Sequence, residues 1–265
     1  MGILNVTPDS FSDGGEHEGL DAALAHARHM IAEGADIIDI GGESTRPGAA
    51  EVSLEEERRR TIPVIEALRA ESDIAISIDT SKPELMREAA AAGADLINDV
   101  RALREPGALE AAADTGLAVC LMHMQGEPRS MQLDPHYRDV VAEVAAFLVE
   151  RREACERHGI PASAILLDPG FGFGKTLEHN LRLLANLPVI AEAGHLLTGL
   201  SRKRMFAAIL GDDTADRTVA SVTAAMRCVA GGAVMIRVHD VRETVDALKV
   251  WLAVEEASVQ ASAAR

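Results

Sequence analysis

Aromatic side chains and positive charge are both scarce in this sequence. Only 3% of the 265 residues are aromatic, and 26 lysines and arginines face 42 acidic residues, which gives a net charge of −16. Nucleic-acid-binding proteins usually present a basic surface, and single strands stack on aromatic rings. We therefore expect no nucleic-acid partner. Apolar residues still make up 48% of the chain, so a core of mainly Ala, Val, Ile and Leu is expected.

Cysteines and long apolar stretches are also few. The three cysteines, Cys120, Cys155 and Cys228, form no C-x-x-C pair, so neither a disulfide framework nor a zinc site is expected. The sequence has no signal peptide and no run of 18 apolar residues, so neither export nor a membrane span is expected. These absences favour a reduced, cytoplasmic protein with no membrane partner.

Short apolar runs alternate with longer segments of helical periodicity along the whole chain. The expected strands lie at 2–6, 37–40, 74–78, 95–98, 117–122, 165–167, 195–200 and 234–238. The expected helices lie at 20–32, 54–68, 83–92, 137–158, 218–230 and 241–254. Such alternation predicts a parallel sheet that is covered by helices.

The number of strand–helix units decides between two architectures. Eight units in roughly 250 residues fit a closed barrel. No linker or low-complexity segment divides the chain, so we predict one domain over residues 1–265. Its predicted fold class is α/β, a single (β/α)8 TIM barrel. The alternative is an open, doubly wound sheet.

Polar or charged residues stand at or near the end of every expected strand. In chain order they are Asn5, Asp39, Asp79, Asn98, His123, Asp168, Ser201 with Lys203, and Arg237 with His239. Each alone has an ordinary explanation, since such residues also cap helices and build turns. The carboxyl ends of barrel strands meet at one face, where active sites are built. Together the eight positions therefore predict one shared small-molecule site.

The cluster combines two kinds of chemistry. Asp79, Asn98 and Asp168 are short, rigid groups that suit a heterocycle rich in N–H groups, because a carboxylate can accept a pair of hydrogen bonds. Positive groups that suit phosphate or diphosphate are Arg46, Lys203, Arg237 and His239. The helix start after Ser201 adds free N–H groups for an anion. Asn5 is a candidate ligand for a Mg²⁺ ion that also touches phosphate.

A glycine-rich segment, 170–174, follows the sixth expected strand. It resembles a phosphate-binding P-loop, but Pro169 stands where that motif needs its first glycine. We interpret it as a thin loop that lets a ligand approach the backbone, with Phe171 and Phe173 as apolar walls. The segments 14–15 and 47–48 are expected to act as lids. For His123 a structural role is favoured over a ligand contact.

The motifs together resemble the dihydropteroate synthase family, the folate-pathway enzymes that sulfonamides inhibit. The matching segments are MGILNVTPDSFSDGG at 1–15, GGESTRPG at 41–48, IDTSKP at 78–83, IND at 97–99, LMHM at 121–124, LDPGFGFGK at 167–175, SRK at 201–203 and RVHD at 237–240. The resemblance implies a transferase that joins (7,8-dihydropterin-6-yl)methyl diphosphate to 4-aminobenzoate. The products would be 7,8-dihydropteroate and diphosphate.

The resemblance also implies a role for each residue of the site. The implied pterin contacts are Asp79, Asn98, Asp168 and Lys203. The implied diphosphate and Mg²⁺ contacts are Asn5, Arg237 and His239. The implied surroundings of 4-aminobenzoate are Thr45, Arg46, Pro47, Phe173 and the helix start at Ser201. Phe11 and Asp13 are implied to be lid residues, and the groups expected to act in catalysis are Lys203, Asp79 and Asp13.

Three further expectations follow from the resemblance. Members of the family usually carry an N-terminal hairpin that closes the bottom of the barrel, whereas this sequence opens directly on the first expected strand. We therefore expect a barrel that lacks the hairpin. The family typically forms homodimers, so a homodimer is expected here. The segment at Pro47 and Gly48 shows no insertion of the kind found in drug-resistant relatives, so we expect inhibition by sulfonamides.

Two other functions stay open at the level of the residues. A pterin-binding methyltransferase barrel of the cobalamin-dependent kind would share the pterin contacts. It would not need the positive groups at Arg46, Lys203, Arg237 and His239. A non-catalytic paralogue would bind pterin without turnover. The presence of every expected motif residue favours the synthase over both.

Overall fold

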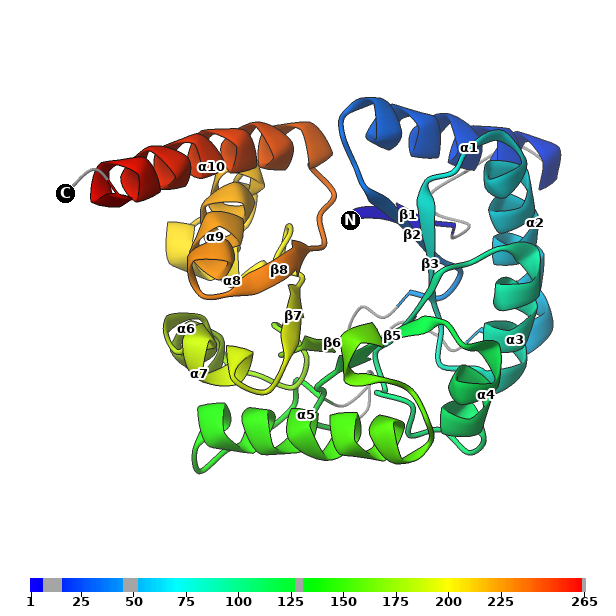
Figure 1. Cartoon of the computed structure of the whole chain (residues 1–265), viewed down its shortest axis with the longest axis horizontal. Helices are drawn as coiled ribbons and strands as arrows, with labels where there is room; N and C mark the ends of the chain where they lie inside the picture. Colours follow the sequence, from blue (N-terminus) through cyan, green and yellow to red (C-terminus); the bar gives the residue numbers. More distant parts are fainter. Residues whose placement is uncertain (7–15, 45–51, 127–130, 264–265) are drawn as a thin grey trace.

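Eight parallel strands form one sheet that curls into a barrel in the computed structural model of the chain (Figure 1). The structure describes residues 1–6, 16–44, 52–126 and 131–263. The strands are β1 (Gly2–Asn5), β2 (Ile37–Gly41), β3 (Ala75–Asp79), β4 (Leu96–Asp99), β5 (Ala118–Met122), β6 (Ile165–Asp168), β7 (His195–Thr198) and β8 (Ala233–Ile236). They follow one another in the sheet in chain order, and each neighbouring pair is parallel.

The last strand lies beside the first and closes the sheet. Gly2 and Val238 form a parallel bridge. The backbone N–H of Ile3 donates to the oxygen of Val238, and the N–H of Val238 donates to the oxygen of Met1, both at 3.0 Å. Closure leaves no free sheet edge and excludes the open, doubly wound alternative. The predicted (β/α)8 architecture is thereby confirmed.

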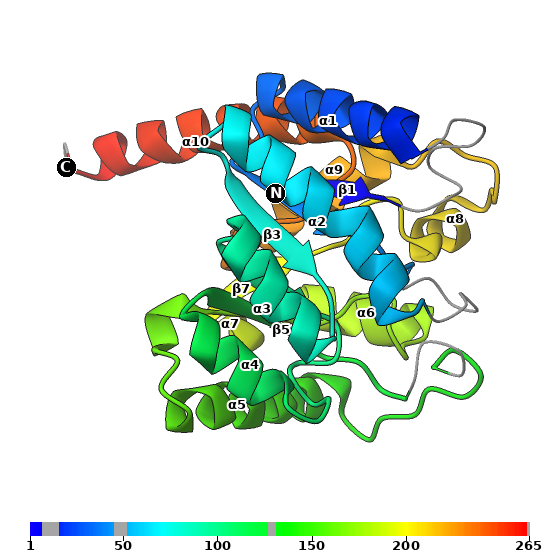
Figure 2. The ribbon, with the colours of Figure 1, turned by 90° about the vertical axis from the view of Figure 1, so that its right-hand side faces the viewer.

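Helices surround the strands on the outside of the barrel (Figures 1 and 2). They are α1 (Glu16–Ala32), α2 (Leu54–Glu71), α3 (Pro83–Ala92), α4 (Ala108–Thr115), α5 (Val140–Arg157), α6 (Leu177–Ala185), α7 (Leu187–Ala191), α8 (Arg204–Leu210), α9 (Thr218–Ala230) and α10 (Val241–Ala263), and the 3-10 turn η2 (Ala162–Ala164) precedes β6. In the described part of the chain, no helix is long and apolar enough to cross a membrane.

Apolar side chains fill the space on both sides of the strands. Successive strand residues point to opposite faces, so Ile38 and Ile40 pack outward under the helices. A second cluster fills the barrel interior at the amino ends of the strands. It consists of Met1, Leu96, Cys120 and Leu197, with Ile37, Ala118, Leu166 and Met235 packed against it. The polar strand ends therefore lie above an apolar plug, to which Met1 contributes its side chain.

The structure differs from the sequence-based elements at some helix and strand bounds and in several short helices. The carboxylate of Asp139 accepts hydrogen bonds from the backbone of Val141 and Ala142, so α5 begins three residues later than expected and Tyr137 lies outside it. The helices α4, α6 and α7 were not predicted, because each is only five to nine residues long. Such lengths carry little periodic signal. By contrast, the predicted bounds of α3 and α9 are confirmed.

Candidate active site

Six residues to which the family resemblance assigns a role line one cavity at the carboxyl ends of the strands. They are Asp79, Asn98, Asp168, Phe173, Lys203 and Arg237. The other lining residues are Val100, Met122, Gly170, Phe171 and Gly199, and the empty volume is about 350 Å³. Six successive strands, β3 to β8, or the loops after them, supply this lining. The cavity combines charged groups with apolar walls, as sites for small molecules generally do.

A fully buried carboxylate, that of Asp39 in β2, links the polar groups of the cavity. Its Oδ2 accepts from Nε of Arg237 at 2.6 Å and from Nδ2 of Asn98 at 3.2 Å. Asp39 thereby sets the positions of two predicted ligand contacts. The sequence reasoning noted Asp39 at a strand end but gave it no role. The signal that could have identified it is a single charge within the apolar strand IIDIG.

Arg237 joins two carboxylates from neighbouring strands. Besides its bond to Asp39, Nη2 of Arg237 donates to Oδ2 of Asp79 at 2.9 Å. Burial lowers the pKa of Arg237, but the carboxylates of Asp39 and Asp79 outweigh burial and raise this pKa above its usual range. The guanidinium was expected beside diphosphate. Without a ligand, the structure places it among the expected pterin contacts.

The three acidic groups around Arg237 compensate for its charge and also repel one another. Burial raises the pKa of Asp79, Arg237 works against that rise, and the carboxylate of Asp39 adds to it. Burial likewise raises the pKa of Asp168, against a hydrogen bond from the backbone of Gly170 and the positive charge of Lys203. Hydrogen bonds from the N–H groups of a ligand stabilise carboxylates that burial has deprived of water. The arrangement suits a heterocycle with several N–H groups.

Lys203 lies against the aromatic wall of the cavity. Its Nζ is 4.3 Å from the ring centre of Phe173, within the range of a cation–π contact. Burial lowers the pKa of Lys203 to about 8, although the carboxylate of Asp168 acts in the opposite direction. Lys203 is therefore largely protonated at neutral pH and can donate to a ligand held by Asp168.

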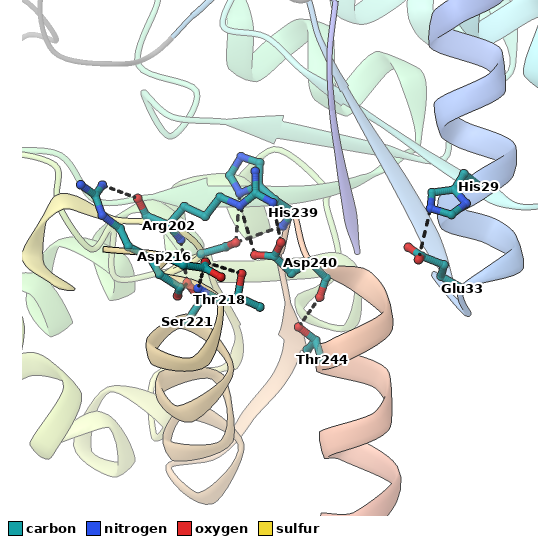
Figure 3. Close-up of polar contacts among 11 residues, drawn as sticks. His29, Glu33, Arg202, Asp216, Thr218, Ser221, His239, Asp240 and Thr244 are labelled. Carbon is teal, nitrogen blue, oxygen red and sulfur yellow. Dashed lines mark hydrogen bonds and ion pairs between the residues drawn. The ribbon is translucent and has the colours of Figure 1, made fainter. Parts of the chain in front are cut away.

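The loop between β7 and α8 is fixed by contacts with the segment after β8 and with α9 (Figure 3). The N–H of Arg202 donates to Oγ of Ser221 at 2.9 Å, and its guanidinium makes two hydrogen bonds to Asp240. Arg202 has a φ of 57°, a costly conformation for a residue with a Cβ atom. Ser201 and His239 are also joined, with Nδ1 of His239 3.0 Å from Oγ of Ser201. These contacts determine where Lys203 enters the cavity.

The glycine-rich loop after β6 is packed against protein backbone. A Cβ atom at Gly170 would lie 1.9 Å from the oxygen of His123, and one at Gly174 would lie 2.3 Å from the oxygen of Gln125. Both glycines have positive φ angles, 65° and 60°. The missing side chains of Gly170 and Gly174 therefore let the segment after β5 approach the loop. Gly170 also lines the cavity, and the interpretation that this loop lets a ligand approach stays a prediction.

His123 lies behind this loop and is not among the residues that line the cavity. Its side chain is buried, and its ring meets the ring of Phe147 edge-on with centres 4.9 Å apart. Nδ1 of His123 is 3.0 Å from Nζ of Lys175. Burial, together with the charge of Lys175, lowers the pKa of His123 to about 2. These contacts agree with the structural role that was favoured for His123.

Comparisons with known proteins show to which family the chain belongs. Residues 1–239 match the family model described as pterin binding enzyme. The chain is 58% identical over 254 residues to a dihydropteroate synthase of Escherichia coli, which covers 94% of this chain and 89% of that protein. The chain belongs to the dihydropteroate synthase family.

Solved structures of the family share the whole fold. The dihydropteroate synthase of Yersinia pestis, in complex with a sulfonamide drug, is 54% identical with a TM-score of 0.90, over 96% of this chain and 93% of that one. The enzyme of Xanthomonas albilineans with 4-aminobenzoic acid is 55% identical with the same TM-score, over 96% and 92%. The resemblance inferred from the sequence motifs is thus confirmed at the level of the family.

Asn5 is the remaining predicted residue at a strand end. It pairs in register with Gly41 of β2, which pairs in turn with Asp79 of β3. Among the described residues, no group of three or more His, Cys, Asp or Glu side chains could hold a metal ion. One amide oxygen is nevertheless a suitable protein ligand for Mg²⁺, which keeps several waters and takes further oxygens from substrate phosphates. The donor set fits a Mg²⁺ ion that arrives with a diphosphate.

Several residues that the family resemblance singled out lie outside the described residues. They are Phe11, Asp13, Thr45, Arg46, Pro47 and Gly48. The expected lid roles, and the expected contacts of Thr45 and Arg46 with 4-aminobenzoate, therefore stay predictions. The same holds for Asp13 in catalysis.

Proposed function

We propose that the chain is a dihydropteroate synthase, a transferase of folate biosynthesis. It joins (7,8-dihydropterin-6-yl)methyl diphosphate to 4-aminobenzoate and forms 7,8-dihydropteroate and diphosphate. The observation that carries this proposal is the cavity at the carboxyl ends of the strands, which is lined by six residues to which the resemblance assigns a role. The proposal treats residues 1–265 as one pterin-binding domain.

The residues of the cavity divide the work of binding the pterin. Asp79, Asn98 and Asp168 offer oxygens to the N–H groups of the ring. Asp39 and Arg237 hold two of these side chains in place. The preorganised polar groups therefore need little rearrangement when the ring enters, which is the main electrostatic advantage of a rigid site. Lys203 donates to the ring from the side of Phe173.

The reaction breaks the bond between the pterin methylene carbon and the diphosphate oxygen, and the electron pair leaves with diphosphate. The electron-rich pterin stabilises the positive charge that develops on the methylene carbon, and the acidic groups of the cavity add to that stabilisation. The neutral amine of 4-aminobenzoate then forms the new C–N bond and releases a proton. The mechanism needs no nucleophile from the protein.

We assign the diphosphate to the mouth of the barrel beside Asn5 and His239. A bound Mg²⁺ would neutralise charge on the departing diphosphate. Burial lowers the pKa of His239 to about 4, so this side chain is neutral near pH 7 and acts as a hydrogen-bonding group. Ser201, Thr45, Arg46 and Asp13 are proposed to complete the surroundings of the second substrate and the lid.

A homodimer in the cytoplasm is proposed as the working form. The exposed Val219 of α9, with 78% of its surface accessible, supports a contact with a second copy through the later helices. Light scattering of the purified chain at micromolar concentration would give the mass of a dimer. The mass of a 28.1 kDa monomer would contradict this part of the proposal.

The proposed reaction is tested by incubating the purified chain with both substrates and Mg²⁺. We expect 7,8-dihydropteroate and diphosphate in equal amounts, and we expect sulfonamides to compete with 4-aminobenzoate. A folded protein that binds the pterin but forms no product would overturn the proposal in favour of a non-catalytic paralogue. Transfer of a methyl group from methyltetrahydrofolate would favour a methyltransferase.

A further inference from the structure

Lys175 lies at the end of the glycine-rich loop and takes no part in the reaction as proposed above. Only 3% of its surface is accessible. Its Nζ lies 3.0 Å from Nδ1 of His123 and donates to the backbone oxygens of Gly170 at 2.8 Å and Phe173 at 3.0 Å. An ammonium group has three N–H donors, so these three shorter contacts use all of them, and the oxygen of His123 lies 3.4 Å away.

The contacts of Lys175 join two neighbouring loops of the barrel. His123 follows β5, whereas Gly170 and Phe173 belong to the loop after β6. These are the two backbone segments that meet where the Cβ atoms of Gly170 and Gly174 would collide with His123 and Gln125. Lys175 therefore fastens the end of β5 to the loop after β6 at their closest approach.

The loop fastened in this way carries part of the cavity wall. The N–H of Gly170 donates to Oδ1 of Asp168 at 2.7 Å. The N–H of Phe173 donates to the oxygen of Gly170 at 3.1 Å, which closes a tight turn over Lys175. The ring of Phe173 then reaches the ammonium of Lys203. A displacement of the turn would move Gly170 and Phe173 relative to both Asp168 and Lys203.

Holding a loop in place with a buried charged group costs free energy. An ammonium loses its hydration when it is buried, and burial lowers the pKa of Lys175 to about 7, against the attraction of Asp168. Neutral side chains hold other oxygens of the same loop. Gln132 donates to the oxygen of Gly172, and the hydroxyl of Tyr137 donates to that of Gly174 at 2.9 Å. Lys175 differs from these residues because its single ammonium group binds the backbone oxygens at both ends of the turn, those of Gly170 and Phe173.

We propose that Lys175, with His123 as its acceptor, is a positioning residue that holds Phe173 over Lys203. The pair thereby sets the aromatic wall against which the amine substrate lies. This inference rests on the proposed synthase function and deepens it, because it assigns a role to two residues outside the cavity. His123 is included because its neutral ring accepts the third hydrogen bond and directs the ammonium toward the loop.

The first test compares two variants that are both expected to be destabilised. Lys175→Met keeps the length of the side chain and removes the ammonium. Leu148→Ala removes a fully buried side chain of α5 and serves as a control for lost stability. At a temperature where both are folded, we expect Lys175→Met to lower kcat/KM for 4-aminobenzoate at least tenfold and Leu148→Ala to leave it within twofold of the parent. Equal values in the two variants would overturn the proposal.

A second test asks whether Lys175 acts through Phe173. The substitution Lys175→Met is introduced into the parent chain and into a Phe173→Ala variant, and the loss of kcat/KM is compared. We expect a loss of at least tenfold in the parent and of less than threefold when the ring is absent. Equal losses in the two backgrounds would show that Lys175 has only a general structural role, and would overturn the proposal.

A third test uses conservative replacement at His123. Asparagine can place an acceptor oxygen near the position of Nδ1, whereas leucine of similar size cannot. We expect His123→Asn to retain at least a third of the parent kcat/KM and His123→Leu to lose at least tenfold. A leucine variant as active as the asparagine variant would remove His123 from the proposal.

Crystal structures separate this inference from the function on which it rests. In the parent we expect the ring of Phe173 to lie beside Nζ of Lys203, and in Lys175→Met we expect it to have moved away. This readout does not need turnover. A parent chain that makes no dihydropteroate would overturn the proposed function alone, whereas an unmoved ring in Lys175→Met would overturn the positioning role alone.

Discussion

Replacing Lys203 by methionine should lower activity and raise stability at the same time. The substitution keeps a long apolar side chain against Phe173 and Gly172. In the parent chain, Nζ of Lys203 lies 4.3 Å from the ring centre of Phe173. Cδ of Lys203 lies 3.3 Å from the position that a Cβ atom on Gly172 would take. The substitution removes only the ammonium group. The loss of one charge-assisted hydrogen bond to the pterin costs about 1.5–3 kcal/mol. We therefore expect kcat/KM for the pterin diphosphate to fall by roughly 10- to 150-fold.

The effect on stability has the opposite sign. Burial lowers the pKa of Lys203 from 10.5 to about 8, so below pH 8 the empty cavity holds a charge that the unfolded chain accommodates more easily. The full shift corresponds to roughly 3 kcal/mol. We reduce this to about 1 kcal/mol, because the side chain is partly exposed and solvent screens its charge. A gain of that size raises Tm by ~2–4 °C for a chain of this length.

The assay combines steady-state kinetics with thermal unfolding at pH 7 and near pH 10. We expect the gain in Tm at pH 7 and its progressive loss between about pH 8 and pH 10.5, where Lys203 is neutral in the folded state and is losing its proton in the unfolded state. Lys249→Met, at a side chain that is 71% exposed in α10, is the matched control and should change neither quantity. A methionine variant at position 203 that keeps parental kcat/KM, or that is less stable than the parent at pH 7, would refute the reasoning.

Three further predictions follow from the same contacts. The kcat/KM of the parent should fall as the pH rises through about 8, since Lys203 loses its proton there, and a pH–rate profile that stays flat through this range would contradict the role of its charge. Asp39→Asn should lower kcat/KM about tenfold because a neutral oxygen binds Arg237 more weakly, and unchanged steady-state kinetics would argue against it. Gly170→Ala should lower the free energy of unfolding in urea by at least ~3 kcal/mol, whereas Gly116→Ala, with a similar φ of 68° and no atom within 4 Å of its Cβ, should cost only ~1–2 kcal/mol. Similar losses in the two glycine variants would rule out the close approach to His123.

Much of the barrel could be predicted because its local signals agree with one another. Pro83 stands at the first position of α3 and Gly93 ends it with a φ of 108°, so both bounds of that helix are visible in the sequence. The strands were visible as apolar runs that end in a polar residue. Closure of the sheet, by contrast, depends on the bridge between Gly2 and Val238. These residues are far apart in the sequence, so no local pattern shows their pairing.

The candidate site, too, could be predicted only in part from the sequence. Asp79, Asn98 and Asp168 could be predicted because each lies near the end of an apolar strand, and the carboxyl ends of parallel strands meet at one face. The connections between them could not, because the pairing of Arg237 with Asp39 and Asp79 depends on which side chains the barrel brings into contact.

The glycine-rich loop shows that a sequence motif does not determine which contacts its residues make. The sequence does not distinguish a glycine that makes room for a ligand from a glycine that makes room for a neighbouring backbone. The structure adds that Gly170 and Gly174 make room for the segment after β5, which the sequence alone does not show. Lys175 was likewise visible only as the end of a motif, and its partners lie on another loop.

The most direct test of the account is a crystal structure of the chain with (7,8-dihydropterin-6-yl)methyl diphosphate bound. We predict the pterin ring in the cavity of about 350 Å³, with its N–H groups within hydrogen-bonding distance of Asp79, Asn98 and Asp168. The diphosphate should point toward Asn5 and His239. A ring bound outside this cavity, or bound within it without contact to these three side chains, would contradict the account.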